Sequence, residues 1–324
     1  MPGPAPIDRR LQFVVGKGGV GKTTVAAALA RLLARAGRRT LAVELDPGRR
    51  LAAMLGASSA GYAAIPAAPG LFLMAVDGRT ALEEYLGLVI PVKRLLQGVF
   101  GSRVYQYFVA AAPGLKELMT IGKIWYEATR LEGGRPAWDA IVVDAPATGH
   151  SLQFLRMPQA ARETFGPGLV QREAARITEL LCDPRSTAVH LVTLAEEMPV
   201  TETLETHAQL VGPMALPLGH VVVNRLHRRR FAPAVVARLR SAAAPAADRP
   251  LLACVAERAV EESGWADINA AQLGRLRAGL GAPPMVELPF VFAEEFGDAE
   301  LDGLARRLEA GTVAARPSAG ERAG

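Results

Sequence analysis

The sequence Gly16-Lys17-Gly18-Gly19-Val20-Gly21-Lys22-Thr23-Thr24 fits the phosphate-binding pattern G-x-x-x-x-G-K-[ST] at every fixed position. Its glycines allow consecutive backbone N–H groups to surround a polyphosphate, while Lys22 can reach the β and γ oxygens and the Thr23 hydroxyl can bind Mg²⁺. A β-type run at residues 11–15 precedes the loop, and apolar residues at helical spacing follow it as far as Gly37. The stretch therefore predicts a strand, a loop and a helix that together hold ATP and Mg²⁺.

Short runs rich in Val, Ile and Leu alternate with longer helical patterns along the rest of the chain, which is typical of a parallel α/β sheet. The further predicted strands cover residues 40–45, 71–76, 140–143, 188–192, 220–223 and 285–288. Strands this apolar suit a sheet that is covered by helices on both faces. The sequence therefore predicts a doubly wound, mainly parallel α/β sheet flanked by helices, in a single domain over residues 1–311.

Residues 80–131 interrupt this alternation. The stretch Thr80-Ala81-Leu82-Glu83 matches a capping box and predicts the start of a helix. Many apolar residues follow, so we expect a helical insertion whose apolar surface either packs against the core or forms a groove or dimer surface. The segment 312–324 is rich in Ala, Gly and Arg and is predicted to be a disordered tail.

The composition of the 324-residue chain excludes several classes of protein. It contains no apolar run of the ~18 residues that cross a bilayer and no signal-peptide pattern at its start, so we expect a cytoplasmic protein. Cys182 and Cys254 are too far apart for a C-x-x-C metal pair, and we interpret both as packed thiols. The net charge is +5, and its densest basic cluster, residues 227–230, is interpreted as a solvated loop rather than a nucleic-acid site.

Two acidic residues follow predicted strands of the sheet. Asp46 comes after residues 40–45, at the carboxyl edge where such sheets bind ligands. A carboxylate there can orient the attacking water and hold a Mg²⁺-bound water. Asp144 ends the run at residues 141–143 and is predicted to bind Mg²⁺ directly or through water. The segment after Asp144 contains Pro and Gly and can act as a switch. His150 is not by itself interpreted as a catalytic base, and a structural role fits it equally well.

Lys17 gives the loop a second lysine, and the whole string GKGGVGKTT resembles the deviant Walker A ATPases. In that group this lysine reaches across a homodimer to the nucleotide of the partner subunit. A cation placed where charge develops on a transferring phosphoryl group stabilises the transition state. The resemblance implies that Lys17 acts in this way and that ATP joins two subunits.

From residue 11 to about residue 297 the chain resembles the ArsA/Get family, which comprises the arsenite-pump ATPase and the targeting ATPase of tail-anchored membrane proteins. Asp46-Pro47 corresponds to the family's switch I, S-T-D-P-A, and residues 144–150 correspond to its switch II, D-T-A-P-T-G-H. Pro113-Gly114 with Glu117 resembles its P-G-x-x-E segment. Val222-Val223-Asn224 resembles its V-V-N strand end, and residues 288–297 resemble the C-terminal stretch that closes near the base.

The resemblance implies a P-loop NTPase of the SIMIBI type that hydrolyses ATP in a cycle of dimer opening and closing. Asn224 would read adenine, and Pro289 would lie near the base. The implied partners are a second copy or a similar subunit, together with a hydrophobic client or an integral membrane protein, while nucleic acid is not expected. The family's zinc-binding C-x-x-C and arsenite-binding cysteines are absent, so arsenite transport does not follow from the resemblance.

The chain differs from the family pattern at two places, and two alternative functions stay open. Glu44-Leu45 replaces the Ser-Thr that precedes the switch I aspartate, and the proline of switch II lies one place early.

A ParA/MinD-like positioning ATPase, acting on DNA or a membrane surface, shares the lysine pair. It would need a basic DNA-binding stripe or a terminal amphipathic helix. A nitrogenase-reductase type would need two cysteines for a shared iron–sulfur cluster.

Overall fold

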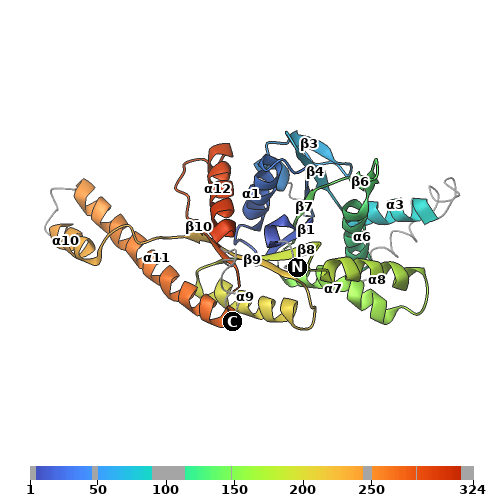
Figure 1. Ribbon diagram of the computed structural model, residues 1–324. Coiled ribbons are helices and arrows are strands. Elements are labelled where there is room, and N and C mark those ends of the chain that lie inside the picture. Colours follow the sequence, from blue (N-terminus) through green and yellow to red (C-terminus); the bar gives the residue numbers. More distant parts are fainter. Residues whose placement is uncertain are drawn as a thin grey trace, which may run out of the picture.

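A central sheet organises the protein in the computed structural model, which describes residues 5–45, 50–89, 114–146, 148–243, 250–281 and 283–314. Its eight described strands lie in the order β10-β9-β8-β1-β7-β2-β4-β3 (Figure 1). They are β1 (Leu11–Gly16), β2 (Thr40–Glu44), β3 (Ile65–Ala68), β4 (Leu71–Ala75), β7 (Ala140–Asp144), β8 (Thr187–Leu194), β9 (Leu218–Leu226) and β10 (Met285–Pro289). Neighbouring strands are parallel except β3 and β4, which confirms the predicted α/β fold.

Helices cover both faces of the sheet (Figure 1). On one face lie α1 (Lys22–Arg35), α2 (Arg50–Met54) and α12 (Asp298–Ala314); on the other lie α6 (Leu115–Thr129), α7 (Thr148–Thr164), α8 (Leu169–Cys182), α9 (Glu197–Val211) and α11 (Pro250–Leu280). Successive strand residues point to opposite faces, so Phe13 and Val15 belong to one apolar core and Val14 to the other. The two cores fix the register of β1 and thereby the position of the loop that follows it.

The remaining elements extend from the two ends of this layered body. At one end, α3 (Gly78–Val89) packs against α6, and the short hairpin of β5 (Leu131–Glu132) and β6 (Arg135–Pro136) leads into β7. At the other end, α10 (Pro233–Ala243) packs against the long α11 and projects away from the sheet (Figure 1). A short 3-10 turn, Pro6–Asp8, precedes β1. Residues 90–113, in the middle of the predicted insertion, lie outside the described residues.

Three details differ from the sequence-based expectations. The predicted capping box is wrong: α3 begins at Gly78, where the Asp77 carboxylate accepts the backbone N–H groups of Arg79 and Thr80 at 3.0 and 3.1 Å. Asp77 is thus the capping residue, and Thr80 is already inside the helix. The edge strand β3 was not predicted, since Pro66 and short side chains hide its pattern. At the other end, α12 continues to Ala314, so Thr312 lies in a helix.

Two buried histidines lie side by side on β8 and β9. The ring of His190 stacks on that of His220 with centroids 5.5 Å apart, and its Nδ1 accepts the backbone N–H of His220 at 3.0 Å. The other ring nitrogen, Nε2, therefore carries the proton and donates to Gln12 Oε1 at 3.0 Å. Burial, followed by the charge of Arg9, lowers the pKa of His220 to about 4, so the folded protein holds this ring neutral.

Acidification should therefore destabilise the fold above pH 4. The unfolded chain takes up a proton at His220 below pH 6.5, while the folded chain does not until about pH 4, so the free energy of unfolding falls as the pH decreases. For this residue we expect a loss of about 2 kcal/mol between about pH 7 and pH 5, measured by urea unfolding. A His220→Leu variant should lose this part of the pH dependence; an unchanged slope in that variant would contradict the assignment.

Candidate functional site

The loop between β1 and α1 adopts a conformation that requires glycine at two positions. Gly16 has φ +154°, and a Cβ there would lie 2.3 Å from the carbonyl oxygen of Val192 on β8. Gly21 has φ +91°, and a Cβ there would lie 2.3 Å from Nδ2 of Asn224 on β9. Side chains at these positions would collide with the neighbouring strand ends. The glycines therefore let the loop lie directly against the carboxyl edge of the sheet.

The N-terminus of α1 opens onto this loop. The helix begins at Lys22, and Gly21 at the cap position provides no side-chain hydrogen bond. The first N–H groups of a helix have no partners within the helix, and their positive end attracts anions. Backbone amides at such a helix start are a ready-made phosphate site. The described geometry thus fits the phosphate-binding role predicted for Gly16, Lys17, Gly18, Gly19, Val20, Gly21, Lys22, Thr23 and Thr24.

Two side chains of α1 point back across the site. Nζ of Lys22 donates to the backbone carbonyl of Lys17 at 2.9 Å. Oγ1 of Thr23 donates to Oδ2 of Asp144 at 2.7 Å, although the two residues are 121 positions apart. A hydroxyl and a carboxylate that converge beside a phosphate loop are the oxygen ligands that Mg²⁺ prefers. The structure thus brings together two of the three residues that were assigned to the metal from the sequence; the third, Asp46, lies outside the described residues.

The Lys17 side chain forms its ion pair within its own subunit. Its ammonium forms an ion pair with the carboxylate of Glu202 on α9, and both side chains are half-buried. The sequence predicted Lys17 but gave no signal for Glu202, because 185 positions separate them and α9 shows no motif at this point. The glutamate lies here because β8, which leads into α9, pairs with β1 up to Gly16 opposite Val192.

A second carboxylate lies beside Asp144. Glu44 ends β2 directly opposite Asp144 on β7 and is buried, with its Oε1 accepting the backbone N–H of Leu51 at 2.8 Å. It thereby fastens the start of α2 to the edge of the sheet. From the sequence, Glu44 was identified only as a departure from the switch I pattern, and its position beside Asp144 was not predicted. Asp46 itself lies in residues 46–49, outside the described residues, as does the side chain of His150.

A cavity of about 310 Å³ opens where β8, β9 and β10 end. Asn224, which was predicted to read adenine, is buried and precedes Arg225, a lining residue of this cavity; its Nδ2 donates to the carbonyl of Val20 in the loop at 2.9 Å. Pro289 ends β10, and the next residue, Phe290, lines the cavity. His227 and Trp265 also line it, and the rings of His227 and Phe290 lie 4.6 Å apart. His227, which directly follows β9, and Trp265 on α11 were not predicted as part of this site, because Trp265 reaches it only where α11 passes the strand ends.

A second cavity, of about 270 Å³, lies between α3, α6 and α8. Most of its lining is apolar and includes Leu118, Met119, Trp125, Val170 and Ile177. The same helix α6 also buries Ile121 and Ile124 in the main core. The described part of the predicted insertion thus packs against the core and also lines a hollow, while the predicted role of its apolar surface as a groove or dimer surface stays a prediction.

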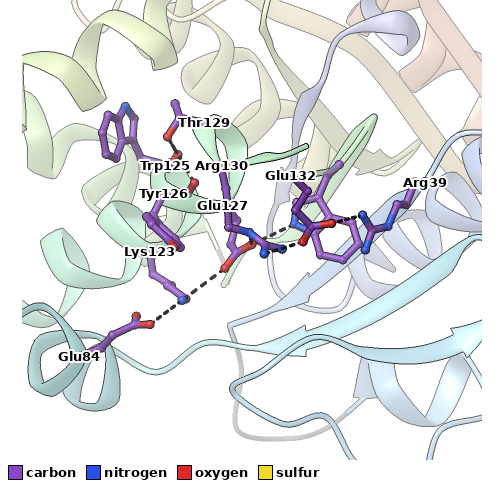
Figure 2. Close-up of polar contacts among 10 residues, drawn as sticks. Arg39, Glu84, Lys123, Trp125, Tyr126, Glu127, Thr129, Arg130 and Glu132 are labelled. Atoms are coloured by element: carbon purple, nitrogen blue, oxygen red, sulfur yellow. Dashed lines mark hydrogen bonds and ion pairs between the residues drawn. The ribbon is translucent and has the colours of Figure 1, made fainter. Parts of the chain in front are cut away.

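A row of charged side chains begins at Glu84 and Lys123, which line this apolar cavity, and its polar contacts are drawn in Figure 2. Nζ of Lys123 lies 2.9 Å from Glu84 on α3 and 3.3 Å from Glu127 on α6. It also lies 5.0 and 4.9 Å from the ring centres of Tyr62 and Tyr126. Further ion pairs continue the row through Arg130 and Glu132 to Arg39, which immediately precedes β2 (Figure 2). This network connects the helices around the cavity to the strand that leads to the nucleotide site.

The basic cluster after β9 is neutralised by acidic side chains from other elements. Arg228 pairs with Glu287, Arg229 with Asp267, and Arg230 with Glu262. These ion pairs give no support to a DNA-binding stripe at residues 228–230.

The two cysteines have different environments. Cys182 is half-buried, but Cys254 is exposed on α11, so its predicted packing is wrong. In the described parts of the chain no group of three or more His, Cys, Asp or Glu side chains is arranged to hold a metal ion.

Comparison with known proteins agrees with this geometry. The sequence profile described as anion-transporting ATPase matches residues 9–173, which include the loop, β7 and Asp144. The chain belongs to the anion-transporting ATPase family. Among its relatives, the ATPase BagA of Mycobacterium tuberculosis is 36% identical over 222 residues, covering 67% of this chain and 65% of BagA. The alignment thus covers slightly less than two thirds of that relative's own length.

This member of the anion-transporting ATPase family has other relatives. The arsenical pump-driving ATPase of Escherichia coli is 29% identical over 235 residues, which cover 65% of this chain and 38% of that protein. Protein Rv2184c of Mycobacterium tuberculosis is 28% identical over 341 residues, covering 92% of this chain and 75% of that protein. Among the residues that the structure describes, no helix is both long and apolar enough to span a bilayer.

Proposed function

We propose that this protein is a Mg²⁺-dependent ATP hydrolase whose two subunits close around ATP. The observation that carries the proposal is the hydrogen bond between Thr23 and Asp144 beside the open start of α1. A hydroxyl and a carboxylate that converge beside a phosphate loop suit a Mg²⁺ ion bound to the β and γ phosphates, and this supports the proposal. Membership of the anion-transporting ATPase family supports the same activity.

Each residue would have a separate task in hydrolysis. The loop amides and Lys22 would bind the phosphates, after Lys22 exchanges its hydrogen bond to the Lys17 carbonyl for the γ-phosphate. Thr23 and Asp144 would hold Mg²⁺, which neutralises charge on the phosphate oxygens. Asp46 would orient the water that attacks the γ-phosphorus, and ADP leaves as the β–γ bond breaks. Asn224, Pro289 and the aromatic cavity beside them would hold the base.

Hydrolysis would be completed by a second subunit, either another copy or a similar chain. Lys17 from one subunit would reach the phosphates bound by its partner and stabilise the charge that develops during transfer. The pairing would be isologous, so that each subunit supplies Lys17 to the other. The transition between open and closed pairs would be the step that hydrolysis drives.

The cavity between α3, α6 and α8 would bind an apolar segment of a client or of an integral membrane partner. Its size, its apolar lining and its position beside α3 support this assignment. The charged row from Lys123 to Arg39 would connect the occupant of this cavity with β2, the strand that precedes Asp46 (Figure 2).

An Asp46→Asn variant should bind ATP and Mg²⁺ but release phosphate at least on the order of 10²-fold more slowly, because the amide cannot orient the attacking water as the carboxylate does. Phosphate release and nucleotide binding would be measured on the same preparation. Proteins that bind this ATP-trapped variant and not a Lys22→Ala variant would then be identified by mass spectrometry. Phosphate release at the wild-type rate would contradict the role of Asp46, and recovery of DNA alone would contradict client binding.

A further inference from the structure

Lys17 is held at two points by its own subunit. Its backbone carbonyl accepts the hydrogen bond from Lys22, and its ammonium pairs with Glu202. The proposed function requires the opposite arrangement, with the ammonium directed at the nucleotide of the partner. The pair with Glu202 is therefore incompatible with the catalytic position of Lys17.

The helix that carries Glu202 is a fixed platform. Val200 and Thr203, on either side of Glu202, are buried in α9. Thr201 Oγ1 also accepts a hydrogen bond from Arg275 of α11 at 2.9 Å, which ties the two helices together. Because α9 is anchored in this way, the Glu202 carboxylate stays in place and Lys17 is the partner that moves when the pair breaks.

We propose that Glu202 is a positioning residue that holds Lys17 within its own subunit until ATP is bound, and thereby sets how readily the closed dimer forms. This inference rests on the proposed function. Two events would release Lys17: ATP draws Lys22 away from the Lys17 carbonyl, and the phosphates of the partner, with several negative charges, compete with the single charge of Glu202. The carboxylate would thus prevent a nucleotide-free subunit from presenting its catalytic lysine.

The ion pair can be tested without any hydrolysis. A carbodiimide activates a carboxylate, and a neighbouring lysine amine then displaces a urea to form an amide. We expect a Lys17–Glu202 amide in the nucleotide-free protein, identified by peptide mass spectrometry, with a yield that falls when Mg²⁺ and a non-hydrolysable ATP analogue are added. Mixing ¹⁴N- and ¹⁵N-labelled chains shows whether the link lies within one subunit. A yield that nucleotide leaves unchanged, or a link only between subunits, would overturn the inference.

Kinetics test the consequence for assembly. In a Glu202→Gln variant we expect the protein concentration that gives half-maximal specific ATPase activity to fall by on the order of threefold, the usual strength of a half-exposed ion pair. The maximal activity should stay unchanged, because Glu202 has already released Lys17 in the closed dimer. Glu205→Gln, on the exposed face of the same helix, removes the same charge and is the matched control.

The two readouts separate failure of the inference from failure of the proposed function. A Glu202→Gln variant with lowered maximal activity, or one that behaves like Glu205→Gln, would show that Glu202 does not restrain Lys17. If the wild-type protein hydrolyses no ATP, the proposed function fails. The response of the Lys17–Glu202 amide to the nucleotide analogue then still decides whether the restraint exists.

Discussion

Replacement of Lys22 by alanine should lower the rate of ATP hydrolysis by on the order of 10³-fold, the usual cost of removing one preorganised donor to the developing charge. The Lys22 ammonium lies at the start of α1, within reach of the phosphates that the loop would bind, and it donates to the loop itself at 2.9 Å. ATP binding should weaken as well, because the lysine contacts the phosphates before and during transfer. Phosphate release and nucleotide affinity, measured together, check both effects.

The matched control for this substitution is Lys116→Ala. Lys116 lies exposed on α6, far along the chain from the loop, and its removal changes the net charge by the same amount. Its hydrolysis rate should equal that of the wild type. If the two alanine variants hydrolysed ATP equally fast, the loop would not be the catalytic site.

Replacement of Glu127 by glutamine should destabilise the fold by about 3 kcal/mol, as expected when one partner of a buried ion pair is removed. The Glu127 side chain is only 6% exposed and accepts hydrogen bonds from Arg130 Nε at 3.0 Å and from Trp138 Nε1 at 2.9 Å. It also forms an ion pair with Lys123 at 3.3 Å. A glutamine has one acceptor oxygen and no charge, so Lys123, itself buried, would lose half of its compensation. Urea unfolding at constant m value measures this loss.

Glu132→Gln is the control for this effect. Glu132 belongs to the same row of ion pairs and bridges Arg39 and Arg130, but it is exposed on the β5–β6 hairpin. Exposed ion pairs contribute little because water screens them, so its unfolding midpoint should stay close to that of the wild type. An equal loss in both variants would mean that burial does not decide the strength of this network.

The sheet could be predicted from sequence because its signals are local. Each buried strand is a continuous apolar run, and the P-loop motif fixes which strand comes first. The edge strand β3 escaped because it contains Pro66 and is only partly buried. The cap of α3 at Asp77 was missed because Thr80, three residues later, also matches the sequence pattern of a capping residue.

The residues around the loop were harder to foresee because they come from distant parts of the chain. Thr23 and Asp144 were each assigned to the metal by motif, and their contact follows from the pairing of β1 with β7. Glu202 belongs to no motif and meets Lys17 only because β8 lies on the other side of β1. In the same way, the acidic partners of the basic cluster after β9 come from α11 and β10. Such contacts depend on strand order, which a single sequence does not reveal.

The central claim is that ATP hydrolysis needs Lys22 from one subunit and Lys17 from its partner. The most direct measurement is the phosphate-release rate of Lys17→Ala and Lys22→Ala chains, alone and mixed in equal amounts. Each variant alone should be inactive. The mixture should recover about a quarter of the wild-type rate, because half of the randomly formed pairs are mixed and each mixed pair has one complete site. Full activity of the Lys17→Ala chain alone, or no recovery while native mass spectrometry shows mixed pairs, would contradict the account.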